Sequence, residues 1–126
     1  IAMKMSDRRA ETMENAIVAA LSAFPPQLVK TITCDRGTEF ANWRRIEERL
    51  HCEVYFADPY CAWQKGTNEN LNGLLREFYP KDRNLSRVAP ATLKRNLALL
   101  NARPRKVLYF HSAQELWDFE LNSCCT

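Results

Sequence analysis

The residues best placed to do chemistry are two acids, Asp35 and Glu69. Asp35 follows a short, β-branched run, Thr31-Ile32-Thr33-Cys34, so we expect it at the carboxyl end of a strand. Glu69 lies just after Thr67, a good helix N-cap, and opens an amphipathic helical pattern. An acid at a strand end and an acid on a later helix can meet across a sheet edge. Because divalent cations in phosphoryl transfer need such carboxylates, Asp35 and Glu69 form a candidate metal site.

Each acid also has an ordinary structural interpretation. Asp is common in turns at strand ends, and Asp35 is followed by Arg36 and Gly37. A carboxylate in the first turn of a helix interacts favourably with the helix dipole, which accounts for Glu69 without catalysis. On spacing alone, this structural interpretation of Glu69 is favoured over a role as a metal ligand. Asp58, which precedes a proline, fits a turn residue equally well.

Three stretches of the chain, in this order, resemble a known family. They read TITCDRGTEFANW, YFADPYCAWQKGTNENLNGLLREFYPKDRNLS and LNARPRKVL. Together they resemble the C-terminal part of an insertion-sequence transposase, a member of the DDE superfamily of transposases and retroviral integrases. The resemblance covers residues 1 to about 117 and is most specific from 35 to 106, whereas residues 118–126 match nothing in the family.

The resemblance implies a role for both acids. Asp35 matches the second metal-ligand Asp of the family, within a D-x-G-x-E-F motif that runs here from Asp35 to Phe40. Glu69 matches the final metal-ligand Glu, in the G-T-N-E-N run. The implied catalytic residues and metal ligands are therefore Asp35 and Glu69, and the implied cofactor is Mg²⁺ or Mn²⁺.

Further residues are expected to support this site. We expect Glu39 to help start a helix, and Asp58 to position a loop near the site without binding metal. Trp63 either packs in the core or offers a surface for stacking bases, and core packing is favoured because lone aromatic residues usually pack. The full supporting set is Glu39, Asp58, Trp63, Gly66 and Asn72.

A DNA strand that enters a carboxylate site needs cations along its phosphate backbone. The densest basic run is Arg103-Pro104-Arg105-Lys106, which on composition alone fits a solvated linker. The family shows an N-x-R-P-R-K run at this place, so the resemblance favours a specific role in DNA binding or in the fold. The expected DNA-binding residues are Lys65, Arg76, Arg103, Arg105 and Lys106.

The family site uses three acids, the first of them an Asp on the first strand of the sheet. Here Ile1–Met5 reads as the end of a strand that passes directly into a helix. Asp7 is the only acid before that helix, and its position suits an N-cap. We therefore expect the chain to lack the first catalytic Asp and to bind its metal weakly.

The pattern of apolar residues predicts strands alternating with helices, which is typical of an α/β fold. The resemblance implies an RNase H-like mixed sheet flanked by helices, incomplete at the N-terminus, within a single domain. Beyond Ile1–Met5, the predicted strands are Leu28–Cys34 and Cys52–Phe56. The predicted helices begin at Ser6 or Asp7, Thr38, Thr67, Pro90 and Ala113, and the last of them ends at Phe119.

Composition sets outer bounds on function. The 126 residues suffice for one domain, and the net charge of +3 permits nucleic-acid binding without requiring it. The five cysteines show no C-x-x-C or Cys/His spacing of a zinc site. Because no apolar run approaches the length of a membrane span, we expect a bacterial cytoplasmic protein that joins the nucleoid when bound to DNA.

The leading hypothesis is the C-terminal part of the catalytic core of a DNA transposase, which binds, cuts and joins DNA by metal-dependent phosphoryl transfer. The alternative is a catalytically inactive remnant that binds DNA or a full-length transposase. A third possibility is an unrelated interaction domain that docks a partner through its leucine stripes. The expected partners are DNA and, because unpaired strand edges invite pairing, a second copy or a full-length transposase.

Overall fold

The computed structural model describes residues 1–59, 61, 66–82 and 84–124. The chain divides into two compact units, one comprising Ile1 and Met3–Gly66 and the other Ala2 and Thr67–Thr126. Among the described residues there are five α-helices and one two-stranded parallel sheet. The predicted α/β class is therefore confirmed at this level of detail.

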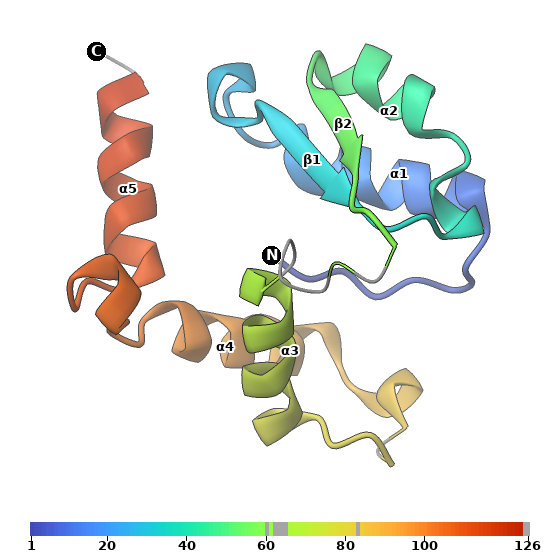
Figure 1. Cartoon of the computed structure of the whole chain (residues 1–126). Helices are drawn as coiled ribbons and strands as arrows, with labels where there is room; N and C mark the ends of the chain where they lie inside the picture. The colour runs from blue at the N-terminus through green and yellow to red at the C-terminus, as the bar shows by residue number, and fades with distance from the viewer. Residues whose placement is uncertain (60, 62–65, 83, 125–126) are drawn as a thin grey trace. The chain divides into compact units, whose positions relative to one another are not determined.

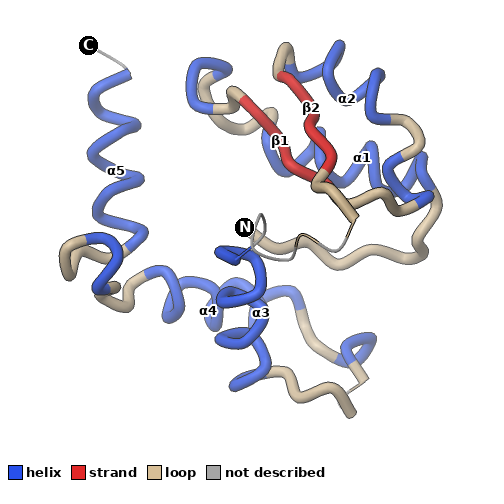
Figure 2. The backbone as a smooth tube through the Cα atoms, viewed as in Figure 1, coloured by secondary structure: helices blue, strands red, loops and turns tan. Residues whose placement is uncertain are grey.

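The first unit contains the sheet. Its elements are α1 (Ala10–Leu21), β1 (Thr31–Cys34), α2 (Trp43–Leu50) and β2 (Glu53–Phe56). The strands lie side by side and parallel, and α1 and α2 pack beside them (Figures 1 and 2). A parallel pair requires a crossover connection, which α2 provides here.

The core of the first unit lies between the helices and the sheet. The predicted apolar stripe of the second helix is confirmed, because Ile46 and Leu50 are buried and Phe40 and Trp43 pack against the same cluster. Removing such side chains from water is the main favourable term in folding. The buried members of the cluster are Val18, Cys34, Ile46, Leu50, Cys52 and Val54.

The second unit is helical, with almost all of α3 (Gly66–Phe78) followed by α4 (Pro90–Asn101) and α5 (Ala113–Cys124). Pro90 occupies the first turn of α4 as predicted, where its missing N–H costs no hydrogen bond. The end of α3 is tied to α4, since the Asn96 amide donates to the Tyr79 hydroxyl at 2.8 Å. Leu100 on α4 is fully buried.

The strand expected at Ile1–Met5 is wrong, because these residues form no regular structure. A strand exists only where a neighbour pairs with it, and in the described part of the chain β1 and β2 pair only with each other. The first helix starts at Ala10, later than predicted. Asp7 instead accepts a hydrogen bond from the Arg9 N–H at 3.0 Å, a local turn that keeps this segment out of the helix.

Three predicted helix limits also differ. The helix expected from Thr38 is interrupted: a 3₁₀ turn covers Thr38–Phe40, and α2 follows Asn42, whose side chain is engaged by the first helix. Thr67 lies inside the first turn of α3. The last helix continues past Phe119 to Cys124, because no proline or glycine stops it and Ser123 bonds back to the Phe119 carbonyl.

Candidate functional site

Asp35 lies at the carboxyl end of β1, as predicted, and its side chain is exposed. Cys34 is paired with Phe56, and the Ala57 N–H donates to the Cys34 carbonyl at 2.8 Å. Because parallel strands end at the same sheet edge, Asp35 and the segment after β2 share that edge. Arg36 and Asp58 form an exposed ion pair across it, with Nη2 and Oδ1 3.9 Å apart.

Gly37 and Glu39 shape the turn after Asp35. A Cβ on Gly37 would collide with the Glu39 carboxylate, so that carboxylate must fold back over the glycine. The backbone at Gly37 has φ of −72°, which any residue adopts. Neither the backbone nor the space therefore demands a glycine here, because the flexible Glu39 side chain could move away from a Cβ. Glu39 lies in the 3₁₀ turn that precedes α2, so its expected role in starting that helix stays a prediction.

A depression of about 450 Å³ lies next to this turn. Trp43 and Phe56 form part of its wall, in edge-to-face contact with ring centroids 5.9 Å apart. The Arg44 guanidinium lies 5.1 Å from the centre of the Trp43 ring. The residues lining the depression are Arg36, Gly37, Phe40, Ala41, Trp43 and Phe56. This edge thus combines an exposed carboxylate, an aromatic wall and nearby guanidinium groups.

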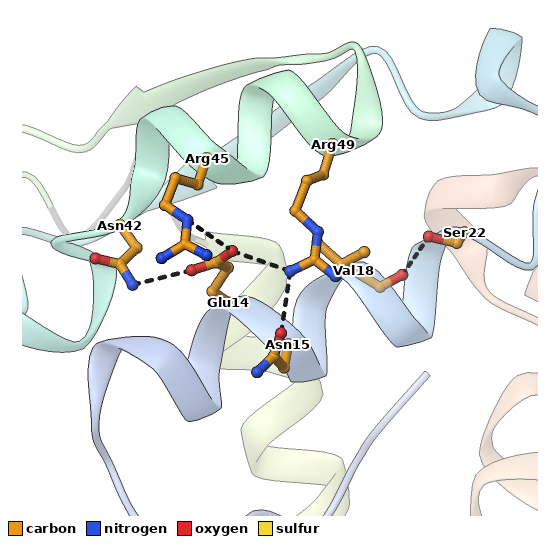
Figure 3. A network of polar contacts seen from close by, with 7 residues as sticks. All are labelled: Glu14, Asn15, Val18, Ser22, Asn42, Arg45 and Arg49. Carbon is orange, nitrogen blue, oxygen red and sulfur yellow. Dashed lines mark hydrogen bonds and ion pairs between the residues drawn. The ribbon is translucent and has the colours of Figure 1, made fainter.

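Sequence reasoning missed a buried acid, Glu14, which links α1 to α2 and to the residue before it. Glu14 on α1 is only 1% exposed. Its carboxylate accepts hydrogen bonds from Asn42 Nδ2 and Arg49 Nη1, each at 2.9 Å, and lies 3.3 Å from Arg45 Nε. Figure 3 shows the Arg45 and Arg49 side chains extending from α2 toward this carboxylate. Arg49 also donates to Asn15 at 3.0 Å.

The network fixes the ionisation of Glu14. Burial alone would raise the pKa of Glu14, but the hydrogen bonds from Arg49 and Asn42 and the nearby Arg45 charge outweigh it and hold the pKa below its ordinary value. The sequence did contain a signal for this network. Glu14 lies beside the apolar positions of the first helix, and Arg45 and Arg49 lie one helical turn apart on the second. The network joins α1 to the residue before α2, downstream of Asp35.

In the second unit, Glu69 lies in the first turn of α3 and is exposed. Asn72 and Arg76 are exposed too, and their spacing places them on the same helix face as Glu69. Gly66 begins α3, and a Cβ there would meet open space, so packing does not demand this glycine. This face of α3 presents a carboxylate, an amide and a guanidinium to solvent.

The basic run at residues 103–106 is part of the folded second unit. Arg103 Nη1 lies 2.9 Å from Glu77 Oε2, and the guanidinium carbon lies 5.8 Å from the centre of the Phe78 ring. The Arg105 N–H donates to the His111 carbonyl at 3.0 Å. Lys106 is exposed at the start of a 3₁₀ turn. Arg103 and Arg105 thus make contacts within the second unit, while the role of the run in DNA binding stays a prediction.

The predicted residues are divided between the two units. Asp35, Glu39 and Asp58 belong to the first unit, whereas Glu69 and the basic run belong to the second. Lys65 and Trp63 lie outside the described residues. Within the part of the chain that the structure describes, no three His, Cys, Asp or Glu side chains are gathered closely enough to hold a metal ion. The carboxylates offer the oxygen ligands that Mg²⁺ prefers, but not a complete site.

Comparison with known proteins finds transposases and a putative integrase. The chain is 38% identical over 119 residues to the transposase for insertion sequence element IS4351 of Bacteroides fragilis, covering 94% of this chain and 36% of that protein. It is 36% identical over 118 residues to the probable transposase for insertion-like sequence element IS1161 of Streptococcus salivarius, covering 94% and 33%. A putative integrase of a Spiroplasma virus is 30% identical over 89 residues, covering 71% and 28%.

These comparisons show that the chain is homologous to part of the insertion-sequence transposases. It spans about a third of the length of these relatives. No protein-family model matches the sequence. None of the helices in the described residues is long and apolar enough to span a bilayer.

Proposed function

We propose that the chain forms the C-terminal part of the catalytic core of a DNA transposase of the DDE superfamily, with an RNase H-like fold to which both compact units belong. The observation that carries the proposal is the homology to transposases over 94% of the chain. The position of Asp35 supports it, because ligands of α/β folds bind at the carboxyl ends of parallel strands.

In this proposal Asp35 and Glu69 are two of three carboxylates that hold Mg²⁺ or Mn²⁺. Both are exposed acids at the start or end of a regular element. Bound divalent cations stabilise the charge that develops during phosphoryl transfer. Glu39 and Asp58 position the loops that flank Asp35, while Trp63, Gly66 and Asn72 support the segment around Glu69.

The proposed substrate is DNA, and its backbone is held by Lys65, Arg76, Arg103, Arg105 and Lys106. Charge supports this assignment. Between Lys81 and Lys106 the sequence has eight Lys and Arg residues and a single acid, Asp82. A basic stretch of this kind attracts phosphates in a manner that weakens steeply with salt. Arg103 also has the fold role described above, so its contribution to DNA binding depends on exchanging Glu77 for a phosphate.

The metal proposal is tested by titrating the chain with Mn²⁺ and following free Mn²⁺ by electron paramagnetic resonance. We expect weak binding that is reduced in both Asp35→Asn and Glu69→Gln. Glu48→Gln, an exposed acid on α2, is the matched control and should bind as the parent chain does. Binding that neither Asp35→Asn nor Glu69→Gln alters would refute the ligand assignment.

The DNA proposal is tested separately, with a fluorescent duplex at several salt concentrations. We expect binding that tolerates changes of sequence and weakens as salt rises. The triple change of Arg103, Arg105 and Lys106 to alanine should weaken it and flatten its salt dependence. Affinity that responds neither to salt nor to the triple change would leave the basic run without a role in DNA binding.

A further inference from the structure

The loop between α4 and α5 exposes a group of large apolar side chains. Tyr109 is 89% exposed and Phe110 is 72% exposed, and their neighbour Val107 is 81% exposed. Single exposed apolar residues are ordinary, but adjacent exposed aromatic residues on one loop mark an interaction surface. We call Arg105–Phe110 the aromatic loop.

The backbone of the aromatic loop is held in an uncommon conformation. Tyr109 has φ of 52° and Phe110 has φ of 66°, both in the left-handed region that bulky residues rarely adopt. In this region the Cβ of a residue crowds the following carbonyl oxygen, which strains the backbone. Strain of this kind persists only where surrounding contacts impose it, and it is found most often at functional sites.

The contacts that impose it close the loop at its base. The Arg105 carbonyl accepts a hydrogen bond from the Phe110 N–H at 3.0 Å, and the Arg105 N–H donates to the His111 carbonyl at the same distance. The Tyr109 N–H donates to the Lys106 carbonyl at 3.1 Å. Pro104 and Ser112 form an antiparallel bridge beneath. The two aromatic side chains are therefore presented on a closed, pre-organised loop.

The positive charge in and before the aromatic loop indicates what kind of molecule it binds. Arg105 and Lys106 lie within the loop, at the end of the basic stretch that begins at Lys81. After Lys106 the chain has no Lys or Arg, and α5 carries only acids among its charged residues. Exposed aromatic rings next to cations are the combination that binds single-stranded nucleic acid, because the rings stack on bases and the cations bind phosphates.

We propose that Tyr109 and Phe110 form a base-stacking tip that contacts unpaired bases of DNA, while Arg105 and Lys106 contact the adjoining phosphates. This inference rests on the proposed function, because DNA is taken as the substrate. It adds that the chain binds locally unpaired DNA in preference to an intact duplex. A rigid aromatic tip loses little conformational freedom when it binds, which favours stacking.

The test compares the full chain with a Tyr109→Ala/Phe110→Ala variant. The probes are a single-stranded oligonucleotide containing 2-aminopurine, the same strand with abasic sites, and the duplex. We expect the parent chain to quench 2-aminopurine and to prefer the base-containing strand. The double variant should bind that strand about 5- to 100-fold more weakly, with an unchanged salt dependence. Lys106→Ala should instead flatten the salt dependence.

Two further variants separate stacking from apolar contact and from misfolding. Tyr109→Phe should retain the affinity of the parent chain and Tyr109→Leu should weaken it, because only an aromatic ring stacks. Phe119→Ala removes an aromatic side chain that is 67% exposed on α5, between two acids, and should leave DNA binding unchanged. Circular dichroism should show the same helix content in every variant.

Each remaining outcome is informative. If the parent chain binds DNA and the double variant binds it equally well, the base-stacking tip is refuted while the proposed DNA substrate stands. Equal affinity for the base-containing and abasic strands refutes it as well. If the double variant changes only self-association, the aromatic loop is a protein contact. If the parent chain binds no DNA at all, the proposed substrate and the base-stacking tip both fail.

Discussion

Arg49 on α2 donates a hydrogen bond of 2.9 Å to Glu14 on α1, across a sequence separation of 35 residues, and the carboxylate that accepts it is almost wholly buried. Asn42 and Arg45 contact the same carboxylate. A buried charge is tolerated only when it is paired and hydrogen-bonded, so these partners are necessary to Glu14. The first unit is thus held by a polar network as well as by its apolar core.

Replacing Glu14 should destabilise the first unit. In Glu14→Ala the side chains of Asn42, Arg45 and Arg49 lose their shared acceptor, and the contact between α1 and α2 is weakened. We expect a lower midpoint of urea-induced unfolding than in Glu11→Ala, an exposed acid on the same helix. Equal midpoints for the two variants would show that the network contributes nothing to stability.

The same network should make the chain sensitive to acid. The pKa of Glu14 in the folded chain is below its ordinary value of about 4.5. Its contribution to stability is therefore fully present above pH 4.5 and is lost as the pH falls through the lowered value. The stability difference between the parent chain and Glu14→Gln, measured by urea unfolding from pH 7 to pH 3, should shrink over that acidic range. A difference that grows on acidification would contradict the assignment.

His51 ends α2 in the left-handed conformation, with φ of 52°. Glycine is favoured at this position because it has no Cβ to clash with the following carbonyl. We expect His51→Gly to stabilise the chain by about 1 kcal/mol. The measurement is thermal unfolding, with His111→Gly as the control at the second histidine, which lacks positive φ. Destabilisation by His51→Gly would mean that the imidazole makes a contact that outweighs the backbone strain.

Ser112 and Glu115 form a reciprocal cap at the start of α5. The Glu115 N–H donates to Ser112 Oγ at 3.1 Å, and the Ser112 N–H donates to Glu115 Oε2 at 2.7 Å. Ser112→Ala should cost about 1 kcal/mol, whereas Ser112→Thr should retain most of the cap. Chemical denaturation measures both. A Ser112→Ala variant as stable as Ser112→Thr would show that the cap is not needed.

Local patterns in the sequence predicted most elements of this fold. The β-branched run before Asp35, the apolar spacing of Phe40, Trp43, Ile46 and Leu50, and the proline at the start of α4 all indicated the structure that is found. Each of these signals is carried by a few adjacent or regularly spaced residues. The strand expected at Ile1–Met5 failed because a strand depends on a partner, which no local pattern supplies.

The candidate site was harder to predict, because it too depends on contacts between residues that lie far apart in the sequence. The assignment of Asp35 and Glu69 to the site came from their motifs and stays a prediction, although both lie at the ends of elements where the motifs place them. Glu14 was missed because its burial depends on arginines on another helix, and an acid in a helix is normally exposed. The left-handed backbone at Tyr109 was missed too, because nothing in a Tyr-Phe pair indicates positive φ.

The cysteines give the first unit a built-in chemical reporter. Cys34 and Cys52 are buried beside the paired strands, whereas Cys124 is exposed at the end of α5. Burial, together with the nearby charge of Glu47, raises the pKa of the Cys52 thiol, which further slows its reaction with alkylating agents. In the folded chain Cys124 should therefore be alkylated before Cys34 and Cys52. Labelling of Cys34 and Cys52 should follow only as the strands open, so that the rate of alkylation measures the opening of the sheet residue by residue.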